Sequence, residues 1–190
     1  ERRIDMMKKS ISKRQMLKRT LAVVLALAMM ITGLPVTALA ETAADSSKDY
    51  PVAQMTYTAG SEELTKGLQW NEGPVRFAFD ENEATLWHSD YEKGDVSNGN
   101  FWVEMKLAEA TYVDAVRYLP GRTNNGDIGG YKIEGTADGE AWTLLTEGTW
   151  EDADGWKIAE FEAVEVVGVR LTATSTYSKY EQNVNGFANA

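Results

Sequence analysis

Apolar and polar residues alternate one by one through much of the chain beyond residue 50. In residues 101–107 the four odd-numbered positions are apolar, and two of the three even-numbered positions are charged. Residues 167–174 repeat the pattern, with Val, Val, Leu and Ala at the odd positions. Because successive side chains of a strand point to opposite faces, this period of two predicts half-buried antiparallel strands.

Turn-forming residues separate these strands at short intervals. Asp138-Gly139 lies between the stretches 131–136 and 142–145, and an Asp-Gly pair readily adopts the positive φ angles of a type I′ hairpin turn. After residue 40, the best candidate for a short helix is Ser61–Lys66. Many short strands with turns every roughly eight to twelve residues predict an all-β sandwich or barrel.

The first forty residues have the three parts of a secretory signal peptide. A basic region up to Arg19 precedes an unbroken apolar run, Leu21–Ile31, and a small-x-small cleavage site ends at Ala40. The run is about half of the roughly 20 residues that a membrane-spanning helix needs, so we expect cleavage and not anchoring. Residues 41–50 are mostly small and polar and are expected to form a disordered lead-in. The folded domain is predicted at 51–190, in a secreted or cell-surface protein.

Charge narrows the class of ligand. The chain has 19 basic and 29 acidic residues, and the first forty residues hold 8 of the former and 2 of the latter. The remainder carries 11 basic and 27 acidic residues, a net charge of −16. Such a surface repels nucleic acid and anionic lipid, which bind clustered lysine and arginine. We therefore expect no nucleic-acid partner and no membrane partner, and a neutral ligand is favoured.

The residue content also argues against catalysis. The chain has no cysteine and one histidine, His88, and it lacks a nucleophile elbow. A disulfide framework, a zinc-thiolate site and a thiol nucleophile are excluded, and no catalytic triad is indicated. The acidic residues offer many carboxylate pairs, but the sequence singles out none for glycoside hydrolysis. We expect a binding protein, not an enzyme.

Short oxygen-bearing side chains gather just before His88. Asp80, Asn82 and Thr85 fall within six residues, and with the carbonyls of a tight loop they suit calcium, which takes six to eight oxygen ligands. The spacing is not that of an EF-hand. The alternative is a polar turn that leads into a strand whose Trp87 fills the core, with His88 pointing the other way, toward a surface.

The segment from Ala78 to Ser89 matches the pattern Ala-x-Asp-Gly-x-x-x-Thr-x-Trp-His-Ser/Thr, with Glu81 in place of the usual glycine. In this segment the chain resembles the family 32 carbohydrate-binding modules of the discoidin-like (coagulation factor V/VIII type C) superfamily. Further similar segments follow in order, from about Met55 to the end of the chain: 101–107, 117–120, 125–128, 131–133, 137–142, 148–150, 156–157 and 169–171. The resemblance implies an eight-stranded antiparallel jelly-roll β-sandwich of the discoidin or galactose-binding-like type.

The resemblance also implies a function. It indicates a non-catalytic module that binds galactose-type or N-acetylhexosamine sugars and targets an attached secreted bacterial glycosidase. Such a module is expected to be a monomer within a multidomain chain. The matching positions assign the polar sugar contacts to His88, Arg122 and Asn125. For the aromatic platform that a sugar needs, the candidates are Tyr91 first, then Tyr177 and Tyr180.

The end of the sequence bears on the metal and on the last strand. In the family, a glutamate and a neighbouring carbonyl that follow a Phe-Ala-x-Ala segment complete the calcium shell. That segment is Phe187–Ala190 here, so we expect the Ala190 carbonyl to join Asp80, Asn82 and Thr85 as a ligand. We also expect the last strand to be missing, which predicts a truncated domain with weaker calcium binding and an exposed sheet edge.

Two other functions stay open at this point. Other discoidin-like domains are adhesion modules that recognise protein or lipid head groups, and lipid-binding ones use exposed apolar spikes with a basic rim. The net charge of −16 argues against the lipid version. The second alternative is a structural spacer without a ligand, which loss of function at His88 or Arg122 would favour.

Overall fold

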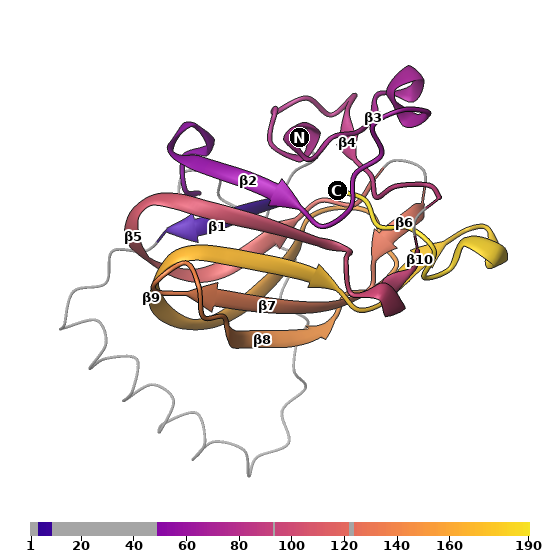
Figure 1. The fold of residues 1–190 in the computed structure, drawn as a ribbon. Coiled ribbons are helices and arrows are strands. Elements are labelled where there is room, and N and C mark those ends of the chain that lie inside the picture. Colours follow the sequence, from indigo (N-terminus) through magenta and orange to yellow (C-terminus); the bar gives the residue numbers. More distant parts are fainter. Residues whose placement is uncertain (1–3, 9–48, 93, 122–123) are drawn as a thin grey trace, which may run out of the picture.

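The computed structural model describes residues 4–8, 49–92, 94–121 and 124–190 (Figure 1). Most of the predicted signal peptide and lead-in therefore lies outside the described residues. Ile4–Lys8 forms a strand, β1, at the edge of the sheet. Tyr50 is only 1% exposed and Asp49 forms an ion pair with Arg117, so the folded domain includes the last two residues of the predicted lead-in.

The fold is all-β. Six strands form one antiparallel sheet in the order β1-β5-β9-β7-β8, with β2 also paired to β5. Their bounds are β2 Met55–Ala59, β5 Trp102–Tyr118, β7 Gly130–Thr136, β8 Thr143–Thr149 and β9 Lys157–Ala173. Two short pairs stand apart from it: parallel β3 Glu72–Gly73 with β4 Leu86–Trp87, and antiparallel β6 Asn125–Ile128 with β10 Thr176–Ser178 (Figure 1).

Strands β5 and β9 are long enough to take part in both layers of a sandwich. Their pairing is interrupted between Lys106 and Thr111, where the register shifts and both ribbons bend (Figure 1). Before the shift, β5 pairs with residues 168–172, and β2, β7 and β8 complete a layer of five strand segments. After it, β5 pairs with residues 157–166 and with β1, which gives a layer of three. The predicted all-β antiparallel sandwich is confirmed.

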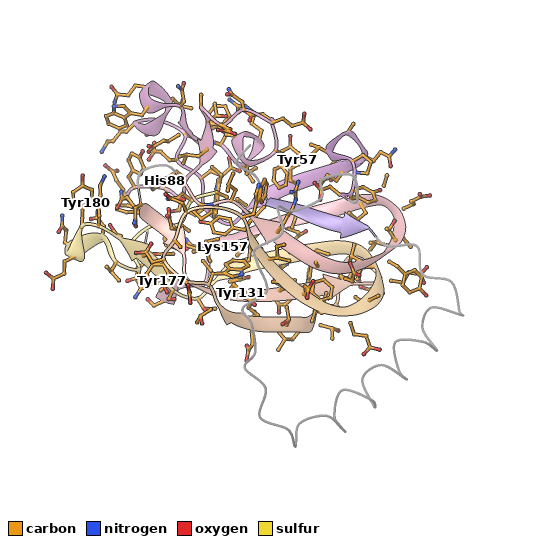
Figure 2. The ribbon with its side chains drawn as sticks, turned by 180° about the vertical axis from the view of Figure 1, so that it is seen from behind. Tyr57, His88, Tyr131, Lys157, Tyr177 and Tyr180 are labelled. Atoms are coloured by element: carbon orange, nitrogen blue, oxygen red, sulfur yellow. The ribbon has the colours of Figure 1, made fainter. Side chains whose placement is uncertain are left out.

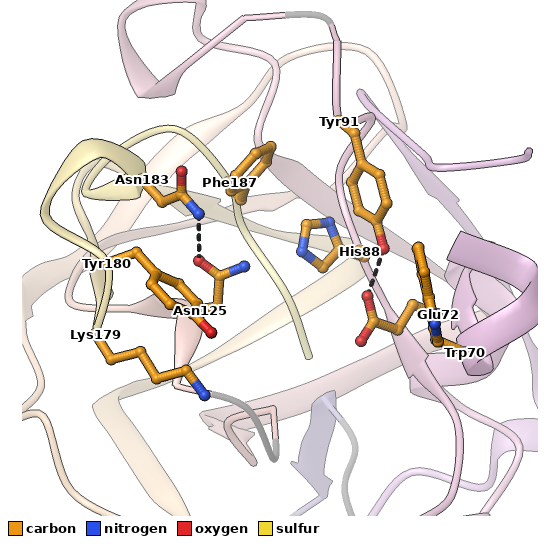
Figure 3. A pocket seen from close by; sticks show the side chains of 9 residues that line it. All are labelled: Trp70, Glu72, His88, Tyr91, Asn125, Lys179, Tyr180, Asn183 and Phe187. Carbon is orange, nitrogen blue, oxygen red and sulfur yellow. Dashed lines mark hydrogen bonds between the residues drawn. The ribbon is translucent and has the colours of Figure 1, made fainter. Parts of the chain in front are cut away.

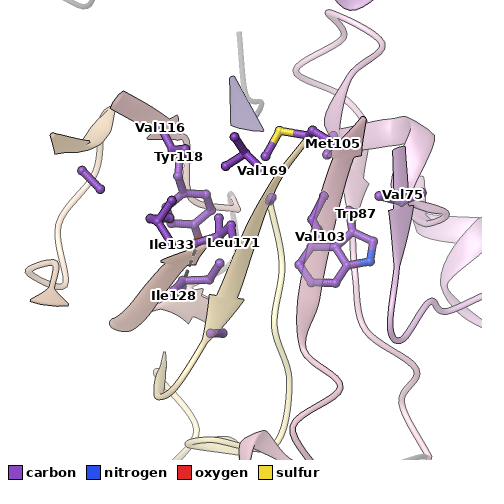
Figure 4. Close-up of a cluster of buried hydrophobic side chains, with 14 of the residues drawn as sticks. Val75, Trp87, Val103, Met105, Val116, Tyr118, Ile128, Ile133, Val169 and Leu171 are labelled. Atoms are coloured by element: carbon purple, nitrogen blue, oxygen red, sulfur yellow. Dashed lines mark hydrogen bonds between the residues drawn. The ribbon is translucent and has the colours of Figure 1, made fainter. Parts of the chain in front are cut away.

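The hydrophobic core follows the predicted alternation. Phe101, Val103 and Met105 of one strand region and Val169 and Leu171 of the other are each at most 1% exposed. Several of them meet in one buried cluster between the strands (Figure 4). Each such side chain stabilises the fold by roughly 1.5–3 kcal/mol relative to an exposed one.

Buried aromatic residues fill the two ends of this core. Trp87 is fully buried, and its indole nitrogen donates to the Ser61 carbonyl at 3.0 Å, so the prediction that it fills the core is confirmed. Trp150 stacks on both Tyr131 and Tyr118, with ring centroids 4.0 and 5.3 Å away.

Glu104, in the first half of β5, is an exception to the pattern in which the polar side chains of this strand face water. Glu104 is only 8% exposed, although the alternation predicts that it faces water. Its carboxylate accepts from Arg170 on β9 at 2.9 Å, and the guanidinium lies over the rings of Trp142 and Trp102, 4.0 and 5.2 Å from their centroids. The Glu104 carboxylate can be buried because it is paired with the opposite charge of Arg170.

The hairpin between β7 and β8 lies where Asp138-Gly139 predicts it, but the predicted type I′ turn is wrong. That turn needs a positive φ at both central residues, and only Gly139 has one, of +81°. Asp138 instead accepts from the backbone nitrogens of Glu140 and Ala141, at 2.8 and 2.9 Å. These hydrogen bonds, with one from Thr136, lower the pKa of Asp138 and stabilise a wider loop.

Within the described ranges there is no α-helix, and the predicted helix at Ser61–Lys66 is wrong. The Glu63 carboxylate accepts from the backbone nitrogens of Thr65 and Lys66 and holds a turn there instead. Helical turns are 3₁₀ turns, at η2 Val52–Gln54, η3 Gly67–Trp70, η4 Val75–Ala78, η5 Val96–Asn98 and η6 Glu181–Asn183. None of the helices in this part of the chain is long and apolar enough to cross a membrane.

Glu81 has a backbone conformation that favours glycine, which the resemblance expects at this position. Its φ of +58° is in the left-handed region, which costs a residue with a Cβ about 1 kcal/mol. We expect Glu81→Gly to raise the melting temperature by about 3 °C in thermal melts, because this gain exceeds the entropy that glycine adds to the unfolded chain. Glu83→Gly is the control: Glu83 has no positive φ, so its melting temperature should fall. If Glu81→Gly and Glu83→Gly lower the melting temperature equally, the backbone of Glu81 is not strained.

Candidate functional site

A pocket of about 490 Å³ opens at the end of the molecule where the two short strand pairs lie (Figure 3). Viewed from behind, His88 and Tyr180 lie together at this end (Figure 2). The walls come from the segment around β3 and β4, the start of β6, the loop after β10 and the final residues. The lining residues are Trp70, Glu72, His88, Tyr91, Asn125, Lys179, Tyr180, Asn183 and Phe187.

Buried Asn189 joins the parts of the chain that form the pocket. Its side-chain oxygen accepts from the Gly121 nitrogen, and its side-chain nitrogen donates to the Asn125 carbonyl, both at 2.9 Å. Its backbone nitrogen donates to the Gly126 carbonyl at 2.9 Å, and it forms a β-bridge with His88. A Cβ on Gly121 would come within 2.5 Å of the Asn189 oxygen, so this close approach requires glycine. Asn189 thus holds His88 and Asn125 on facing walls.

His88 presents a neutral imidazole to the pocket. Its Nδ1 lies 2.7 Å from the Ser89 carbonyl, and since a carbonyl only accepts, Nδ1 carries the proton. Burial lowers the pKa of His88, because the charged form loses its hydration. The ring packs edge-on against Tyr91 and is tilted against Phe187, with centroids 4.7 and 5.3 Å away. The Asn125 backbone also lies within hydrogen-bonding reach of the ring.

Tyr91 and Glu72 form the wall beside His88. The Tyr91 hydroxyl donates to the Glu72 carboxylate at 2.5 Å (Figure 3). Burial and this hydrogen bond raise the pKa of Tyr91, so the phenol stays protonated. Trp70 follows behind, with its ring 6.5 Å from that of Tyr91. This wall offers hydrogen-bond acceptors framed by aromatic rings.

Asn125 and the loop after β10 form the opposite wall. The Asn125 side-chain oxygen accepts from Ser178 Oγ at 2.8 Å and from Asn183 Nδ2 at 3.1 Å. With the oxygen engaged in this way, the amide nitrogen points into the pocket as a donor (Figure 3). Lys179 and Tyr180 stand at the rim, with the Lys179 ammonium 5.2 Å from the centre of the Tyr180 ring.

Four of the six sugar-site residues predicted from the sequence line one pocket: His88, Asn125, Tyr91 and Tyr180. Tyr177 does not line it, because its hydroxyl donates to the Trp150 carbonyl at 3.0 Å and its ring packs against Gly129. Arg122 lies outside the described residues. The resemblance thus predicted a common site for residues 88, 91 and 125, and the fold brings these three residues together in one pocket.

Five lining residues were not predicted: Trp70, Glu72, Lys179, Asn183 and Phe187. Phe187 belongs to the segment 187–190, whose sequence pointed only to the metal and to the last strand. Its contacts with the rings of His88 and Tyr91 join residues about a hundred positions apart. Trp70 could have been noticed in the sequence, because it is a large apolar residue outside any alternating stretch. Nothing in the sequence placed it beside Tyr91.

The buried Glu63 carboxylate supports the pocket from behind. It accepts from the backbone nitrogens of Thr65, Lys66 and Tyr91, at 2.7, 2.6 and 3.2 Å, and from the Thr65 hydroxyl. Burial by itself would raise the pKa of Glu63, but these hydrogen bonds outweigh it and lower the pKa to about 2. The backbone nitrogen of Glu63 also donates to the His88 carbonyl at 2.9 Å. Glu63 therefore fixes both Tyr91 and the strand that carries His88.

Three of the four predicted calcium ligands, Asp80, Asn82 and Thr85, share one turn beside β4. The Thr85 hydroxyl lies 2.8 and 3.0 Å from the two carboxylate oxygens of Asp80 and 2.8 Å from the Asn82 carbonyl. The Ala190 carbonyl accepts from Trp87, two residues beyond Thr85, and a carbonyl has a second lone pair. Among the residues described there is no cluster of three His, Asp or Glu side chains, so a cation here would depend on neutral oxygens as well. The donor set fits the oxygen preference of calcium.

Comparisons with known proteins give this pocket a context. Residues 56–188 match the F5/8 type C domain family. The solved structure of CpGH89CBM32-5 from Clostridium perfringens, in complex with GalNAc-β-1,3-galactose, is 30% identical, with a TM-score of 0.62 and coverage of 74% of this chain and 93% of that one. The family 32 module of NanJ from the same organism, in complex with galactose, is 29% identical, with a TM-score of 0.56 and coverage of 73% and 90%. CBM32-3 from a family 31 glycoside hydrolase of Clostridium perfringens is 25% identical, with a TM-score of 0.58 and coverage of 74% and 89%.

The low pKa of Glu63 predicts acid-sensitive stability. Because the carboxyl binds protons less readily in the folded state, its contribution is complete above pH 4.5 and is lost as the pH falls toward about 2. Glu63→Gln should cost about 2 kcal/mol at pH 7, and its melting temperature should fall less than that of the parent between pH 5 and pH 3. Glu62→Gln, which removes a carboxylate that accepts one 3.4 Å bond from Val75, is the control. Parallel pH profiles of parent and Glu63→Gln would contradict this role.

Proposed function

The chain belongs to the F5/8 type C domain family and is a non-catalytic carbohydrate-binding module, and we propose that its pocket takes a terminal sugar of the galactose or N-acetylhexosamine type. The observation that carries the proposal is the pairing of His88 and Asn125 across one pocket, beside the rings of Tyr91 and Phe187. A sugar has hydroxyls that both donate and accept, and one apolar C–H face. The site supplies the imidazole of His88, an amide donor on Asn125 and aromatic surface next to them.

The choice of sugar follows from relatives and from charge. The relative that is 30% identical is in complex with GalNAc-β-1,3-galactose, and the one that is 29% identical is in complex with galactose. The carboxylate of Glu72 lies in the pocket, and the chain beyond residue 40 has a net charge of −16. Both disfavour an anionic ligand, so an uncharged sugar is the better fit.

The pocket chemistry agrees with binding without turnover. Glycoside hydrolysis uses a pair of carboxyl groups on either side of the bond that is cleaved. Among the described lining residues, Glu72 is the single carboxylate. It is already engaged by the Tyr91 hydroxyl, which makes it an acceptor at the wall.

A lipid-binding adhesion module is the second candidate, and one observation favours it. Leu64, Leu68 and Trp70 are between 43% and 58% exposed in one loop, which is the kind of apolar surface that a membrane-binding domain uses. The basic rim is weak, because Lys66 of that loop is paired with Glu92. A glycan ligand therefore remains the better explanation of this end of the molecule.

The setting of the module is also part of the proposal. We infer that the chain is exported by a bacterium and acts as a monomeric unit attached to a glycosidase. The predicted signal peptide supports export, and the name of one relative ties it to a family 31 glycoside hydrolase. The module would hold that enzyme near its glycan substrate.

One sugar in an open pocket should bind modestly. We expect a Kd on the order of 0.1–1 mM for galactose or GalNAc by isothermal titration calorimetry. Asn125→Asp keeps the oxygens that accept from Ser178 and Asn183 but removes the donor, so affinity should fall at least tenfold with little change in melting temperature. Gln54→Glu makes the same charge change outside the pocket and should bind like the parent. Unchanged affinity in Asn125→Asp would contradict the assignment.

We further propose that calcium binds at Asp80, Asn82, Thr85 and the Ala190 carbonyl and stabilises the fold without contacting the sugar. At a calcium concentration one hundred times the Kd, binding adds about 2.7 kcal/mol to the free energy of unfolding. A chelator should therefore lower the melting temperature of the parent, whereas Asp80→Ala should melt lower and no longer respond to the chelator. Asp152→Ala, an exposed acid elsewhere, should respond like the parent. A parent melting curve that ignores the chelator would disprove the site.

A further inference from the structure

Trp70 is a large apolar side chain left open to solvent at the rim of the pocket. It is 56% exposed, although it lines the pocket and its ring lies 6.5 Å from that of Tyr91, tilted by 32°. It ends the turn η3, and Leu68 of the same turn is 43% exposed. Exposed apolar surface beside a pocket is informative, because folding alone gives no reason to keep it there.

The loop that carries Trp70 is tied down at both ends to the strand that carries His88. The Glu63 nitrogen donates to the His88 carbonyl at 2.9 Å, and the His88 nitrogen donates to the Gly73 carbonyl at 3.1 Å. Just after Trp70, the Asn71 carbonyl accepts from Leu86 at 3.0 Å. The backbone that carries the indole is therefore ordered before a ligand binds, so a ligand that stacks on Trp70 loses little affinity to ordering of the loop.

Glu72 links Trp70 to the floor of the pocket. One oxygen of the Glu72 carboxylate accepts from Tyr91, and the other points toward the side of the pocket that carries Asn125 and Lys179 (Figure 3). A ligand that leaves His88 and Asn125 toward Trp70 would pass this acceptor. The opposite rim, with Lys179, Tyr180 and Asn183, is more polar.

We propose that Trp70 is the platform of a second subsite, which stacks on the sugar that follows the terminal one, so that the module recognises at least a disaccharide. This inference rests on the proposed function, because the first sugar is taken to occupy the floor at His88 and Asn125. Stacking on an indole suits the C–H face of an uncharged pyranose, and the Glu72 oxygen accepts a hydroxyl between the two rings. Trp70 thereby sets specificity without taking part in binding of the monosaccharide.

Calorimetric titration of the 190-residue chain tests this with two pairs of ligands: galactose against lactose, and GalNAc against GalNAc-β-1,3-galactose. The parent should bind at least one disaccharide about fivefold more tightly than its monosaccharide. Trp70→Ala should reduce that ratio to about one and leave the monosaccharide Kd within twofold, while Trp70→Phe should keep part of the ratio. Tyr112→Ala, which removes an exposed aromatic ring outside the pocket, is the control and should keep the whole ratio. Because Trp70 is exposed, thermal melts of all variants should agree within a few degrees.

The outcomes separate this inference from the proposed function. If the parent binds the monosaccharides but shows no preference for either disaccharide, or if Trp70→Ala keeps the preference, the subsite is disproved and the proposed function stands. If a Tyr180→Ala variant loses the preference for the disaccharide and Trp70→Ala keeps it, the second sugar lies on the opposite rim and the assignment of the subsite to Trp70 is overturned. If the parent binds no sugar but sediments with phosphatidylcholine–phosphatidylserine vesicles, and Trp70→Ala does not, then lipid occupies this surface and both proposals fail.

Discussion

The hydrogen bonds that hold Ala188–Ala190 between β4 and β6 determine where the ligand-facing side chains lie. Trp87 and Ala190 exchange two backbone hydrogen bonds, at 2.8 and 3.0 Å, and the Asn189 nitrogen donates to the Gly126 carbonyl on the other side. Ser89 and Ala188, 99 positions apart in the sequence, are joined by two more. All of these groups are buried, so breaking the pairing would strand polar atoms away from water at a cost of about 1–3 kcal/mol each. Residues 188–190 thereby join the segments that carry His88 and Asn125.

Side-chain hydrogen bonds hold the loops on both sides of the pocket in place. Glu63 accepts three hydrogen bonds from Thr65 and Lys66 and one from the Tyr91 nitrogen, and the Asn125 oxygen accepts two from the facing loop. A fully paired polar network specifies one arrangement, whereas a partly paired one is costly. A rigid site lowers the entropy cost of binding, and an open pocket for one sugar still limits affinity. The loop that carries Trp70 is held in the same way, so its exposed indole can stack on a ligand without prior ordering of the loop.

Charged side chains have different partners in the sandwich and at the pocket. In the sandwich, buried charges are matched with an opposite charge and an aromatic face, as in Glu104 with Arg170 and in Asp49 with Arg117, whose guanidinium lies over Trp156. At the pocket, Glu72 is held by a neutral hydroxyl and keeps an oxygen for a ligand. The first arrangement stabilises the fold, and the second leaves an acceptor available, which suits a neutral partner with many hydroxyls.

The sequence by itself determined the strands, because period-two alternation in 101–107 and 167–174 leaves one way to bury the apolar residues. It also determined that Trp87 is in the core, and the resemblance assigned His88 and Asn125 to one site. The tertiary structure decided what depends on contacts between distant residues: that Phe187 packs on His88, that Trp70 stands beside Tyr91, and that Tyr177 points to Trp150 instead of the pocket. It also decided the turn at Asp138, because side-chain hydrogen bonds to the backbone outweighed the preference of the Asp-Gly pair. Local patterns encode which face of a strand is buried, but the partners of loop residues are set only when segments far apart in the chain pack together.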